Sequence, residues 1–278
     1  MFSDIINRMA KHIAIITVVY NNYTILEDFT SSLRAQSNQE YHLYIADASE
    51  HKQEIMLKDI PHTVISVENK GYAYGVNECI QQAVIDNIKE FCIINDDVFF
   101  DALFVKNLHQ GFQAHPDSIF GGKIYYASGY EYHKKIYQPD ELGKVIWYAG
   151  GSVDWNNAIT KHRGVDMVDP KLFEKIENTD FITGCFMCFD SEVVDKIGFW
   201  DEKYFLYYED ADYCERAKKH NIKLWYDPSI VIWHKNAQST DGSGSVTHQK
   251  YQKKAQMRFA LKYAPLRTKL HVLKNFLL

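Results

Sequence analysis

The sequence predicts an α/β domain built on a doubly wound, mostly parallel sheet. Short runs of β-branched and aliphatic residues alternate with longer segments that carry apolar residues on one helical face. Polar residues follow several of these runs directly, as they do at the carboxyl ends of strands in such sheets. The 278 residues are enough for one large domain with a modest appendage and a full hydrophobic core.

The first hundred residues alternate regularly between expected strands and helices. His12 to Val19 is a β-branched run typical of a buried parallel strand. A helix is expected at 24–35, where Leu26, Phe29 and Leu33 share one face. The remaining elements of this half are expected strands at 41–46, 62–67 and 91–94 and an expected helix at 73–88. This alternation favours parallel pairing.

The pattern becomes less regular after Asp101. The expected elements are a helix at 103–114, a strand at 118–124, an irregular loop at 125–142, strands at 145–155 and 180–189, a helix at 208–220, and short strands at 223–226 and 230–233. A Gly/Ser linker at 238–246 then leads to a helical tail. We therefore divide the chain into a domain at 1–237, with halves at 12–100 and 101–237, and a tail at 238–278.

Polar residues stand at the ends of four expected strands in the first half. They are Tyr20-Asn21, Asp47-Ala48-Ser49, Asn69-Lys70-Gly71 and Asn95-Asp96-Asp97. Ligands of doubly wound sheets bind beyond the carboxyl ends of the strands, so we expect these groups to line one site. The glycines after Asn69 would let a ligand approach the backbone at a helix N-terminus that favours phosphate, although a plain turn is the alternative.

Asn95-Asp96-Asp97 is a candidate binding site for a hard divalent cation. Mg²⁺ and Mn²⁺ prefer oxygen ligands, and Mg²⁺ is usually held by one or two carboxylates together with phosphates of the substrate. The alternative is that Asp97 or Asp101 caps the next helix. His234 follows an expected strand and is a further candidate ligand, although a lone histidine is more often structural.

Three carboxylates crowd together near the start of an expected helix, at Glu209, Asp210 and Asp212. Acidic side chains at a helix N-terminus complement the helix dipole. Asp212 and Arg216 are four residues apart and could form a surface ion pair. The alternative for Asp210 is that it faces the site as a general base.

Charge is unevenly divided along the chain. The net charge is −5, yet the first 241 residues carry 23 basic and 36 acidic side chains, whereas the last 37 carry eight basic and no acidic ones. No nucleic-acid partner is expected. The tail places Leu266, Leu270, Leu273 and Leu277 at helical spacing among Arg267, Lys269 and Lys274. Such a helix suits an anionic membrane surface, and packing on the acidic body or a dimer contact are the alternatives.

Five cysteines are an odd number without the spacing of a disulfide framework. Cys185 and Cys188 lie in an expected buried strand and have no second pair, which argues against structural zinc and favours a reducing cytoplasm. The first eleven residues are interrupted by Asp4, Arg8 and Lys11, unlike a signal peptide, and no run approaches about 18 apolar residues.

The ordered motifs between about His12 and Lys235 resemble those of the inverting family-2 glycosyltransferases of GT-A fold, most closely the rhamnosyltransferase-like branch. The matching residues are Thr17-Val18-Val19-Tyr20-Asn21, Asp47-Ala48-Ser49, Asn69 to Asn77, Asn95-Asp96-Asp97, Gly150-Gly151-Ser152-Val153-Asp154-Trp155, Thr183-Gly184-Cys185, Gly198 to Asp212, Pro228 and His234. Each motif is weak alone, and the ordered set is specific. The chain departs from the family pattern at the shortened Asp47 motif, at Asn95 and at Phe189-Asp190, where the family has arginine.

The resemblance implies a GT-A fold, with a Rossmann-like nucleotide-binding half and an acceptor half, and it implies a role for each matched residue. Donor contacts are implied at Thr17, Tyr20, Asn21, Asp47, Asn69, Gly71, Asn77 and Asp96, with Asp47 reading the base and Asp96 near the ribose. Mn²⁺ or Mg²⁺ is implied at Asp97 and His234, the catalytic base at Asp210, and acceptor contacts at Glu209, Gly184 and Trp147.

The implied reaction moves a sugar from a nucleotide diphosphate donor, dTDP-rhamnose or a UDP-sugar, to a hydroxyl of a growing, lipid-linked cell-surface polysaccharide. One general base without an enzyme nucleophile implies a single displacement with inversion. The matching expectation is a cytoplasmic protein at the inner face of the cell membrane, with a homodimer as one option for its assembly. The alternatives are a sugar nucleotidyltransferase, which would need a Gly-rich basic loop in place of Tyr20-Asn21-Asn22-Tyr23, and a non-catalytic nucleotide-sugar or glycan-binding protein.

Overall fold

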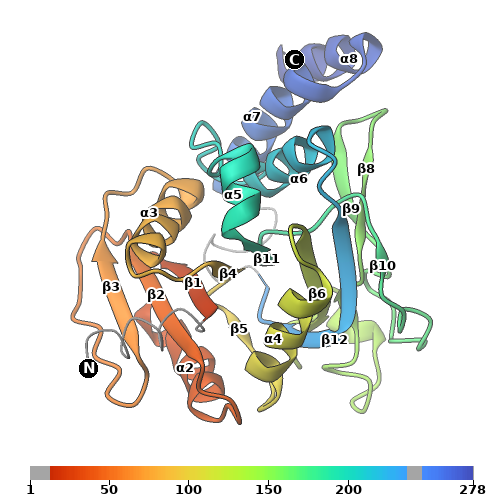
Figure 1. Cartoon of the computed structure of the whole chain (residues 1–278). Coiled ribbons are helices and arrows are strands. Elements are labelled where there is room, and N and C mark those ends of the chain that lie inside the picture. Colours follow the sequence, from red (N-terminus) through yellow and green to blue (C-terminus); the bar gives the residue numbers. More distant parts are fainter. Residues whose placement is uncertain (1–12, 237–245, 278) are drawn as a thin grey trace.

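The computed structural model describes residues 13–236 and 246–277, which form a mixed ten-stranded sheet, a separate two-stranded hairpin and flanking helices (Figure 1). The strands are β1 (Ile13–Val19), β2 (Tyr41–Asp47), β3 (His62–Ser66), β4 (Glu90–Ile94), β5 (Val98–Phe99), β6 (Ile119–Tyr126), β7 (Ile146–Tyr148), β8 (Gly151–Asp154), β9 (Ile159–His162), β10 (Glu177–Asn178), β11 (Phe186–Asp190) and β12 (Leu224–His234). The helices are α2 (Leu26–Arg34), α3 (Tyr72–Ile85), α4 (Phe104–Ala114), α5 (Ser191–Ile197), α6 (Glu209–Lys219), α7 (Val246–Tyr263) and α8 (Leu266–Leu277), with short 3₁₀ helices η1 (Tyr23–Ile25) and η2 (Lys134–Ile136).

The sheet runs in the order β10-β12-β6-β11-β4-β1-β2-β3, with β5 added to β12 and β7 to β6. Strands β3, β2, β1 and β4 are parallel, as the alternating pattern predicts. The register sets Val19 opposite Asp47 and Asp47 opposite Ser66. The polar residues that follow these strands therefore meet at one edge of the sheet.

Strand β11 joins the parallel strands to the rest of the sheet. It is antiparallel to both β4 and β6, and β6 pairs in parallel with β12. Residues Phe186 to Phe189 are buried, as expected of a central strand covered on both faces. The GT-A expectation of a mostly parallel central sheet with flanking helices and C-terminal helices is confirmed.

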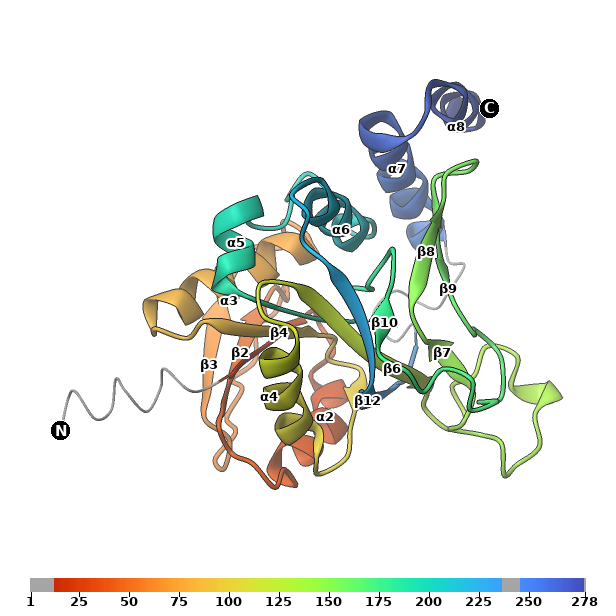
Figure 2. The same ribbon diagram turned by 45° about the vertical axis from the view of Figure 1, so that its right-hand side comes forward.

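Helices cover both faces of the sheet. In Figure 2, α3, α5 and α6 lie above the sheet and α2 and α4 below it. The β8–β9 hairpin stands beside the sheet, with α7 and α8 next to it. No helix in residues 13–236 or 246–277 combines the length and apolar character needed to cross a membrane.

Several elements differ from the sequence predictions. The strand expected at 145–155 is two strands, β7 and β8, because Gly150 adopts a φ of +94° between them. The strand expected at 180–189 begins only at Phe186. The two short strands expected at 223–226 and 230–233 are one strand, β12, with a register shift between Asp227 and Val231. The expected linker lies outside the described residues, except that Val246 begins α7.

Candidate active site

Asp47 ends β2 and is held in place by the loop that follows β1. Its side chain is buried, and the Tyr23 hydroxyl donates hydrogen bonds of 3.1 and 2.9 Å to its two carboxylate oxygens. The Ser49 backbone N–H donates to Asp47 Oδ1 at 3.0 Å. The Ser49 hydroxyl accepts in turn from the Asn21 backbone N–H at 2.8 Å, with Asn21 left-handed at a φ of +57°. One corner of the site therefore holds three residues that we expected to contact the donor: Asn21, Asp47 and, beside them, Tyr20.

Tyr20 and Asn69 extend this corner. The Tyr20 hydroxyl donates to Glu50 at 3.1 Å, and Asn69 partly offsets the rise in the pKa of Tyr20 that burial and Glu50 cause. Thr17, two residues before the end of β1, is fully buried, and its hydroxyl has no hydrogen-bond partner among the described residues. The corner thus presents amide, phenol and carboxylate groups from the ends of β1, β2 and β3.

Asp97 and His234 face one another at the centre of the site. Asp97 follows β4, His234 ends β12, and His234 Nε2 lies 3.1 Å from Asp97 Oδ1. The pairing of β5 with β12 sets this distance, because His234 is opposite Val98 and the Lys235 N–H donates to the Asp97 carbonyl at 2.9 Å. Both side chains are buried.

The charges in this region are strongly coupled. Burial opposes protonation of His234, but the neighbouring Asp97 and Cys185 raise its pKa well above the usual value. Burial, and then the charge of Asp97, raise the pKa of Asp96 well above its usual value. Trp147 packs edge-on against the His234 ring with centroids 4.6 Å apart. Trp147, which we expected to contact the acceptor, thus packs against the imidazole of His234 and restricts its position.

The donor set at this point fits a divalent ion held jointly with a substrate. The part of the chain that the structure describes contains no group of three or more His, Cys, Asp or Glu side chains arranged to hold a metal on their own. Asp97 and His234 offer one carboxylate and one imidazole, which matches cations that complete their shell with phosphate oxygens. A metal ion bound by Asp97 and His234 would require the imidazole in its neutral form, so metal binding would release any proton that His234 carries.

Asp210 is the second residue of α6 and lies against the turn before β11. The Gly184 backbone N–H donates to Asp210 Oδ2 at 2.8 Å, and the Ala211 N–H donates to Oδ1 at 2.7 Å. Burial raises the pKa of Asp210 to about 6, while these hydrogen bonds oppose the shift. A carboxylate with a pKa of about 6 is ionised at neutral pH and can accept a proton, as a general base must.

Glu209 is the neighbouring acid on the same turn. It is buried, and its Oε2 has no hydrogen-bond partner within the described part of the chain. Burial, and then the charge of Asp210, raise the pKa of Glu209 well above its usual value. Burial thus acts differently on the two adjacent acids: the hydrogen bonds of Asp210 limit its pKa to about 6, whereas Glu209 lacks such bonds from Gly184 and Ala211 and the charge of Asp210 raises its pKa further.

The backbone directly before Glu209 and Asp210 is strained. Tyr207 and Tyr208, just before α6, adopt φ values of +69° and +67°. Each left-handed non-glycine residue costs about 1–3 kcal/mol and persists only where its surroundings enforce it. The Tyr208 hydroxyl donates to the Ala158 carbonyl at 3.1 Å, which fixes the second of the two residues to the β8–β9 hairpin.

Tyr72 is a site residue that the sequence predictions missed. Its hydroxyl lies 3.2 Å from Asn95 Oδ1 and 3.4 Å from the Gly184 carbonyl, so it links the end of β4 to the turn before β11. Burial, with the nearby charges of Cys185 and the site acids, raises the pKa of Tyr72 well above its usual value. Its position directly after Gly71, at the start of α3, could have indicated that Tyr72 is a site residue.

Gly71 and Asn77, two of the expected donor contacts, hold the segment that leads to α6. Gly71 has a φ of +108°, and a Cβ there would lie 2.4 Å from the Phe205 carbonyl oxygen. The Asn77 side chain makes three hydrogen bonds with residues 200–202: it donates to the Trp200 carbonyl and to Glu202, and accepts from the Trp200 N–H. Helix α3 therefore supports the catalytic segment as well as bordering the donor corner.

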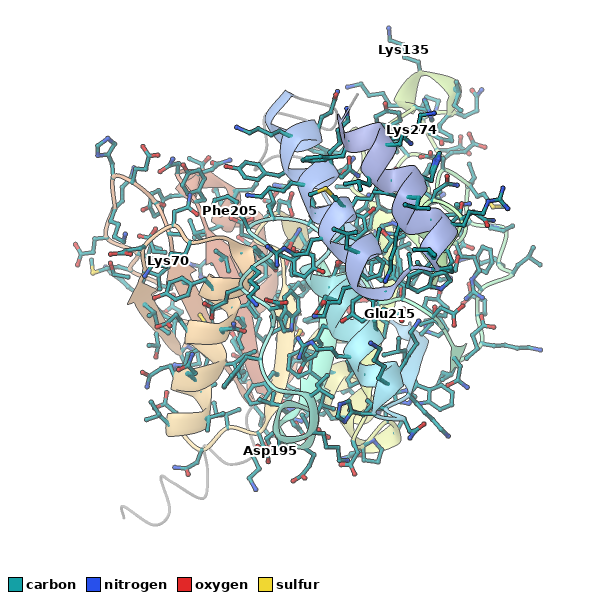
Figure 3. All side chains as sticks on the ribbon, turned by 90° about the horizontal axis from the view of Figure 1, so that it is seen from above. Lys70, Lys135, Asp195, Phe205, Glu215 and Lys274 are labelled. Carbon is teal, nitrogen blue, oxygen red and sulfur yellow. The ribbon has the colours of Figure 1, made fainter. Side chains whose placement is uncertain are left out.

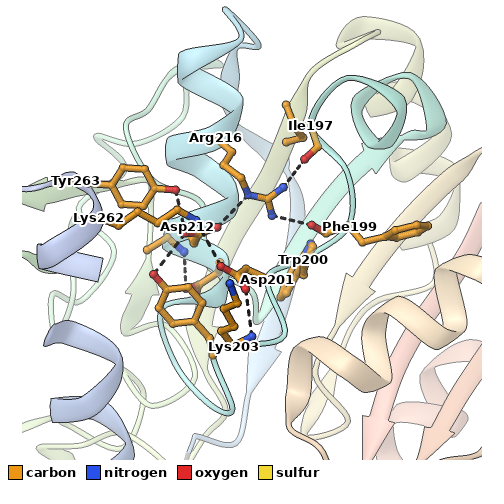
Figure 4. Close-up of polar contacts among 12 residues, drawn as sticks. Ile197, Phe199, Trp200, Asp201, Lys203, Asp212, Arg216, Lys262 and Tyr263 are labelled. Atoms are coloured by element: carbon orange, nitrogen blue, oxygen red, sulfur yellow. Dashed lines mark hydrogen bonds and ion pairs between the residues drawn. The ribbon is translucent and has the colours of Figure 1, made fainter. Parts of the chain in front are cut away.

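Asp212 is paired with Arg216, as its spacing predicts, but the pair is not on the surface. Asp212 is fully buried, with Arg216 Nε 2.9 Å from Oδ2. Lys262 Nζ lies 2.6 Å from Oδ1, and the Tyr263 hydroxyl donates to the same oxygen at 2.9 Å (Figure 4). Asp212 thus binds helix α7 through Lys262 and Tyr263. The spacing of residues around Asp212 could not predict these two partners.

Helix α7 packs on the body beside the site. Phe259 is fully buried, with its ring 5.6 Å from Trp155 and 5.3 Å from Tyr208. Tyr251 stacks on Phe205 at 4.8 Å. Seen from above, α7 and α8 lie side by side across the top of the molecule, with Phe205 next to α7 (Figure 3). Packing on the body, one of the three alternatives for the tail, is confirmed for α7.

Comparison with known proteins agrees with this arrangement. A family model described as glycosyl transferase family 2 matches residues 14–198. The low-salt glycan biosynthesis hexosyltransferase Agl10 of Haloferax volcanii is 23% identical over 180 residues, which cover 64% of this chain and 53% of that protein. The chain thus spans about half the length of the curated relative it matches.

Solved structures share the fold. A crystal structure of GalNAc-T7 with UDP, GalNAc and Mn²⁺ superposes with a TM-score of 0.67 at 13% identity, covering 90% of this chain and 47% of that one. The mannosyltransferase PcManGT of Pyrobaculum calidifontis, in complex with GDP-Man and Mn²⁺, superposes with a TM-score of 0.52 at 12% identity, covering 95% and 69%. At these identities the similarity establishes the GT-A fold and nothing finer.

Proposed function

Because the chain belongs to glycosyl transferase family 2, we propose that it transfers a hexose from a nucleotide diphosphate sugar to a saccharide hydroxyl, with inversion at the anomeric carbon. The observation that carries the proposal is Asp210, an acid fixed by two backbone N–H groups and with a pKa of about 6. A buried carboxyl with a raised pKa and two fixed hydrogen bonds is typical of a catalytic base, and a non-catalytic sugar-binding protein would not need one.

In the proposed reaction Asp210 takes the proton of the acceptor hydroxyl as that oxygen bonds to the anomeric carbon. The bond from the anomeric carbon to the diphosphate oxygen breaks in the same displacement, and the electron pair leaves with the nucleoside diphosphate. Such proton transfer contributes about 10²–10⁴-fold to a rate. A divalent ion held by Asp97 and His234 would stabilise the charge that develops on the diphosphate. Glu209, whose pKa is raised by burial and then by the charge of Asp210, would donate a hydrogen bond to the acceptor.

The donor would lie along the edge formed by β1, β2 and β4. Asp47, fixed by Tyr23 and Ser49, would hydrogen-bond the base, and Asp96 would lie near the ribose. The motif resemblance favours dTDP-rhamnose, with UDP-sugars as the competing donors. The two solved structures that share the fold hold UDP and GDP-mannose, so a donor panel must include dTDP, UDP and GDP sugars.

Donor screening tests this proposal. Purified protein is incubated with dTDP-rhamnose, UDP-sugars and GDP-mannose, each with Mn²⁺ or Mg²⁺, and release of nucleoside diphosphate is measured with and without saccharide acceptors. We expect turnover of one donor class, lost in Asp210→Asn. Donor binding without turnover in the wild type, under any metal, would identify a binding protein instead.

We further propose a lipid-linked acceptor and peripheral contact with an anionic membrane through α8. The helix exposes Leu266, Leu270, Leu273 and Phe276, at 73%, 61%, 37% and 43%. Arg267, Lys269 and Lys274 lie among these residues, and a helix that is apolar on one face and basic on the other binds anionic lipid surfaces. A membrane at α8 would bring lipid-linked saccharides close to the site.

Flotation with vesicles containing anionic lipid tests α8 alone. Leu266→Ser with Leu270→Ser removes exposed apolar area, whereas deletion from residue 248 would also remove the buried Phe259. We expect the wild type to float and the double variant to remain at the bottom. Equal flotation would reject the membrane contact, and a wild-type dimer that becomes monomeric in the double variant would assign α8 to a homodimer.

A further inference from the structure

We propose that helix α7 is a positioning element for the catalytic base: Lys262, Tyr263 and Phe259 hold the first turn of α6 and thereby Asp210 in its working place. The inference rests on the proposed function of Asp210. It adds residues that lie far from the family motifs in the sequence and that do not touch the reacting atoms.

The first step is electrostatic. Asp212 has no exposed surface, so its charge requires partners within the protein. Arg216 contacts one carboxylate oxygen of Asp212. The other is contacted by Lys262 at 2.6 Å and Tyr263 at 2.9 Å from α7, and more weakly by the Tyr204 hydroxyl at 3.4 Å. Lys262 also reaches Asp201 at 3.4 Å, on the segment that enters the catalytic loop. Removing Lys262 would take away one of the two cationic partners that compensate the charge of the buried Asp212 carboxylate.

The second step concerns the backbone. Asp212 donates its N–H to the Tyr208 carbonyl at 2.9 Å, which closes the first turn of α6 around Glu209 and Asp210. Tyr208 and Tyr207 are both left-handed, a state that surrounding contacts must enforce. Phe259 packs against the Tyr208 ring and stacks on Trp155, so α7 supplies part of that enforcement.

The third step connects this turn to the base. Asp210 lies two residues before Asp212 and two after Tyr208, between the two points that α7 contacts. Its carboxylate is aligned by the Gly184 and Ala211 N–H groups, so a rotation of the turn would misalign both hydrogen bonds. Small misplacements of a catalytic group can cost about 10²-fold in rate. Lys262 and Phe259 are therefore positioning residues.

Lys262→Met is the central variant, with Lys262→Arg as the conservative replacement and Lys254→Met as the matched control on the exposed side of the same helix. For the donor identified by screening, we expect kcat of Lys262→Met to fall about tenfold or more while the Kd of the donor changes less than about twofold. Lys262→Arg should recover most of kcat, and Lys254→Met should match the wild type.

A second measurement does not depend on activity. Hydrogen exchange of the backbone amides at 209–213 should accelerate in Lys262→Met and in Phe259→Leu, while amides of the central strand β11 remain as protected as in the wild type. Thermal unfolding establishes that each variant is folded under the assay conditions. The exposed Leu261→Ala serves as the control for Phe259→Leu.

The outcomes separate this inference from the proposed function. Wild-type exchange at 209–213 in folded Lys262→Met, or an unchanged kcat, would overturn the positioning role. If no donor is turned over by the wild type, the proposed function fails, and the exchange measurement still decides whether α7 orders the turn. A third outcome would also overturn the proposal: a loss of kcat that Lys262→Arg does not recover, together with faster exchange throughout β11. It would show that Lys262 contributes only to the general stability of the protein.

Discussion

The Gly184 backbone N–H donates a 2.8 Å hydrogen bond to Asp210 Oδ2, and this contact joins the turn before β11 to the first residues of α6. The same turn meets Tyr72, whose hydroxyl lies 3.4 Å from the Gly184 carbonyl. The base is therefore aligned by a peptide group in a turn that also contacts the start of α3. A side chain held in this way has little freedom to turn away from a substrate.

Replacing Asp210 by Asn should abolish transfer while donor binding persists. The amide cannot accept the acceptor proton, so we expect kcat to fall by at least about 10²-fold. Donor affinity, measured by calorimetry, should stay within about threefold of the wild type because no donor position includes Asp210. Asp195→Asn, on an exposed surface, is the control. Near-normal turnover of Asp210→Asn would remove this residue from the mechanism.

The pH dependence should show an acid limb with a midpoint near 6. Burial raises the pKa of Asp210 to about 6, so the carboxyl keeps its proton to a higher pH than an exposed aspartate and loses its function as a base below that value. We expect kcat/KM to fall about tenfold per pH unit below 6. Activity must return on neutralisation, which separates titration from unfolding. A limb centred near pH 4 would contradict the assignment.

Chelation should remove activity, and Mn²⁺ or Mg²⁺ should restore it. If Asp97 and His234 hold the ion, then Asp97→Asn and His234→Gln should raise the metal concentration for half-maximal activity by at least about tenfold. The buried pair His115 and Asp227 has the same 3.1 Å separation and lies outside the site, so His115→Gln is a geometric control. An equal effect of His115→Gln would show that loss of any buried His–Asp pair produces the change.

Gly71→Ala should destabilise the protein through a collision. A Cβ there would lie 2.4 Å from the Phe205 carbonyl oxygen, whereas Gly129, with a similar φ of +87°, has nothing within 4 Å. Gly129→Ala should therefore cost about 1 kcal/mol, from backbone strain alone. Gly71→Ala should cost at least about 3 kcal/mol. Denaturant unfolding measures both, and equal costs would show that the contact with Phe205 yields easily.

The sequence was sufficient to predict the first half of the fold. β1, β2 and β4 are runs of β-branched and aliphatic residues that stop at polar groups, and the structure confirms that these ends meet at one edge. Elements of the second half are shorter and set by single residues. Asp190 is the N-cap of helix α5, and its carboxylate accepts from the Val193 N–H at 3.1 Å, a capping signal that the sequence predictions did not use.

The residues of the candidate site also divide into those that the sequence could predict and those that it could not. The resemblance implied a shared metal role for Asp97 and His234, which come from different parts of the chain, and in the structure the two side chains lie 3.1 Å apart. The partners of Asp212 could be predicted only as far as Arg216, because spacing within a helix identifies i,i+4 pairs. Lys262 and Tyr263 lie 50 and 51 residues away on another helix, and no local pattern indicates them.

The ion pair between Asp212 and Lys262 also has a consequence for how the molecule is made. A chain that emerges from the ribosome amino-terminus first exposes α6 well before α7, since 50 residues separate the two partners. Until α7 arrives, Asp212 has its local partner Arg216 but lacks the lysine and the tyrosine from the tail. The turn that carries Glu209 and Asp210 is then among the last parts of the body to mature, so a nascent chain can complete its central sheet while its active site is still unfinished.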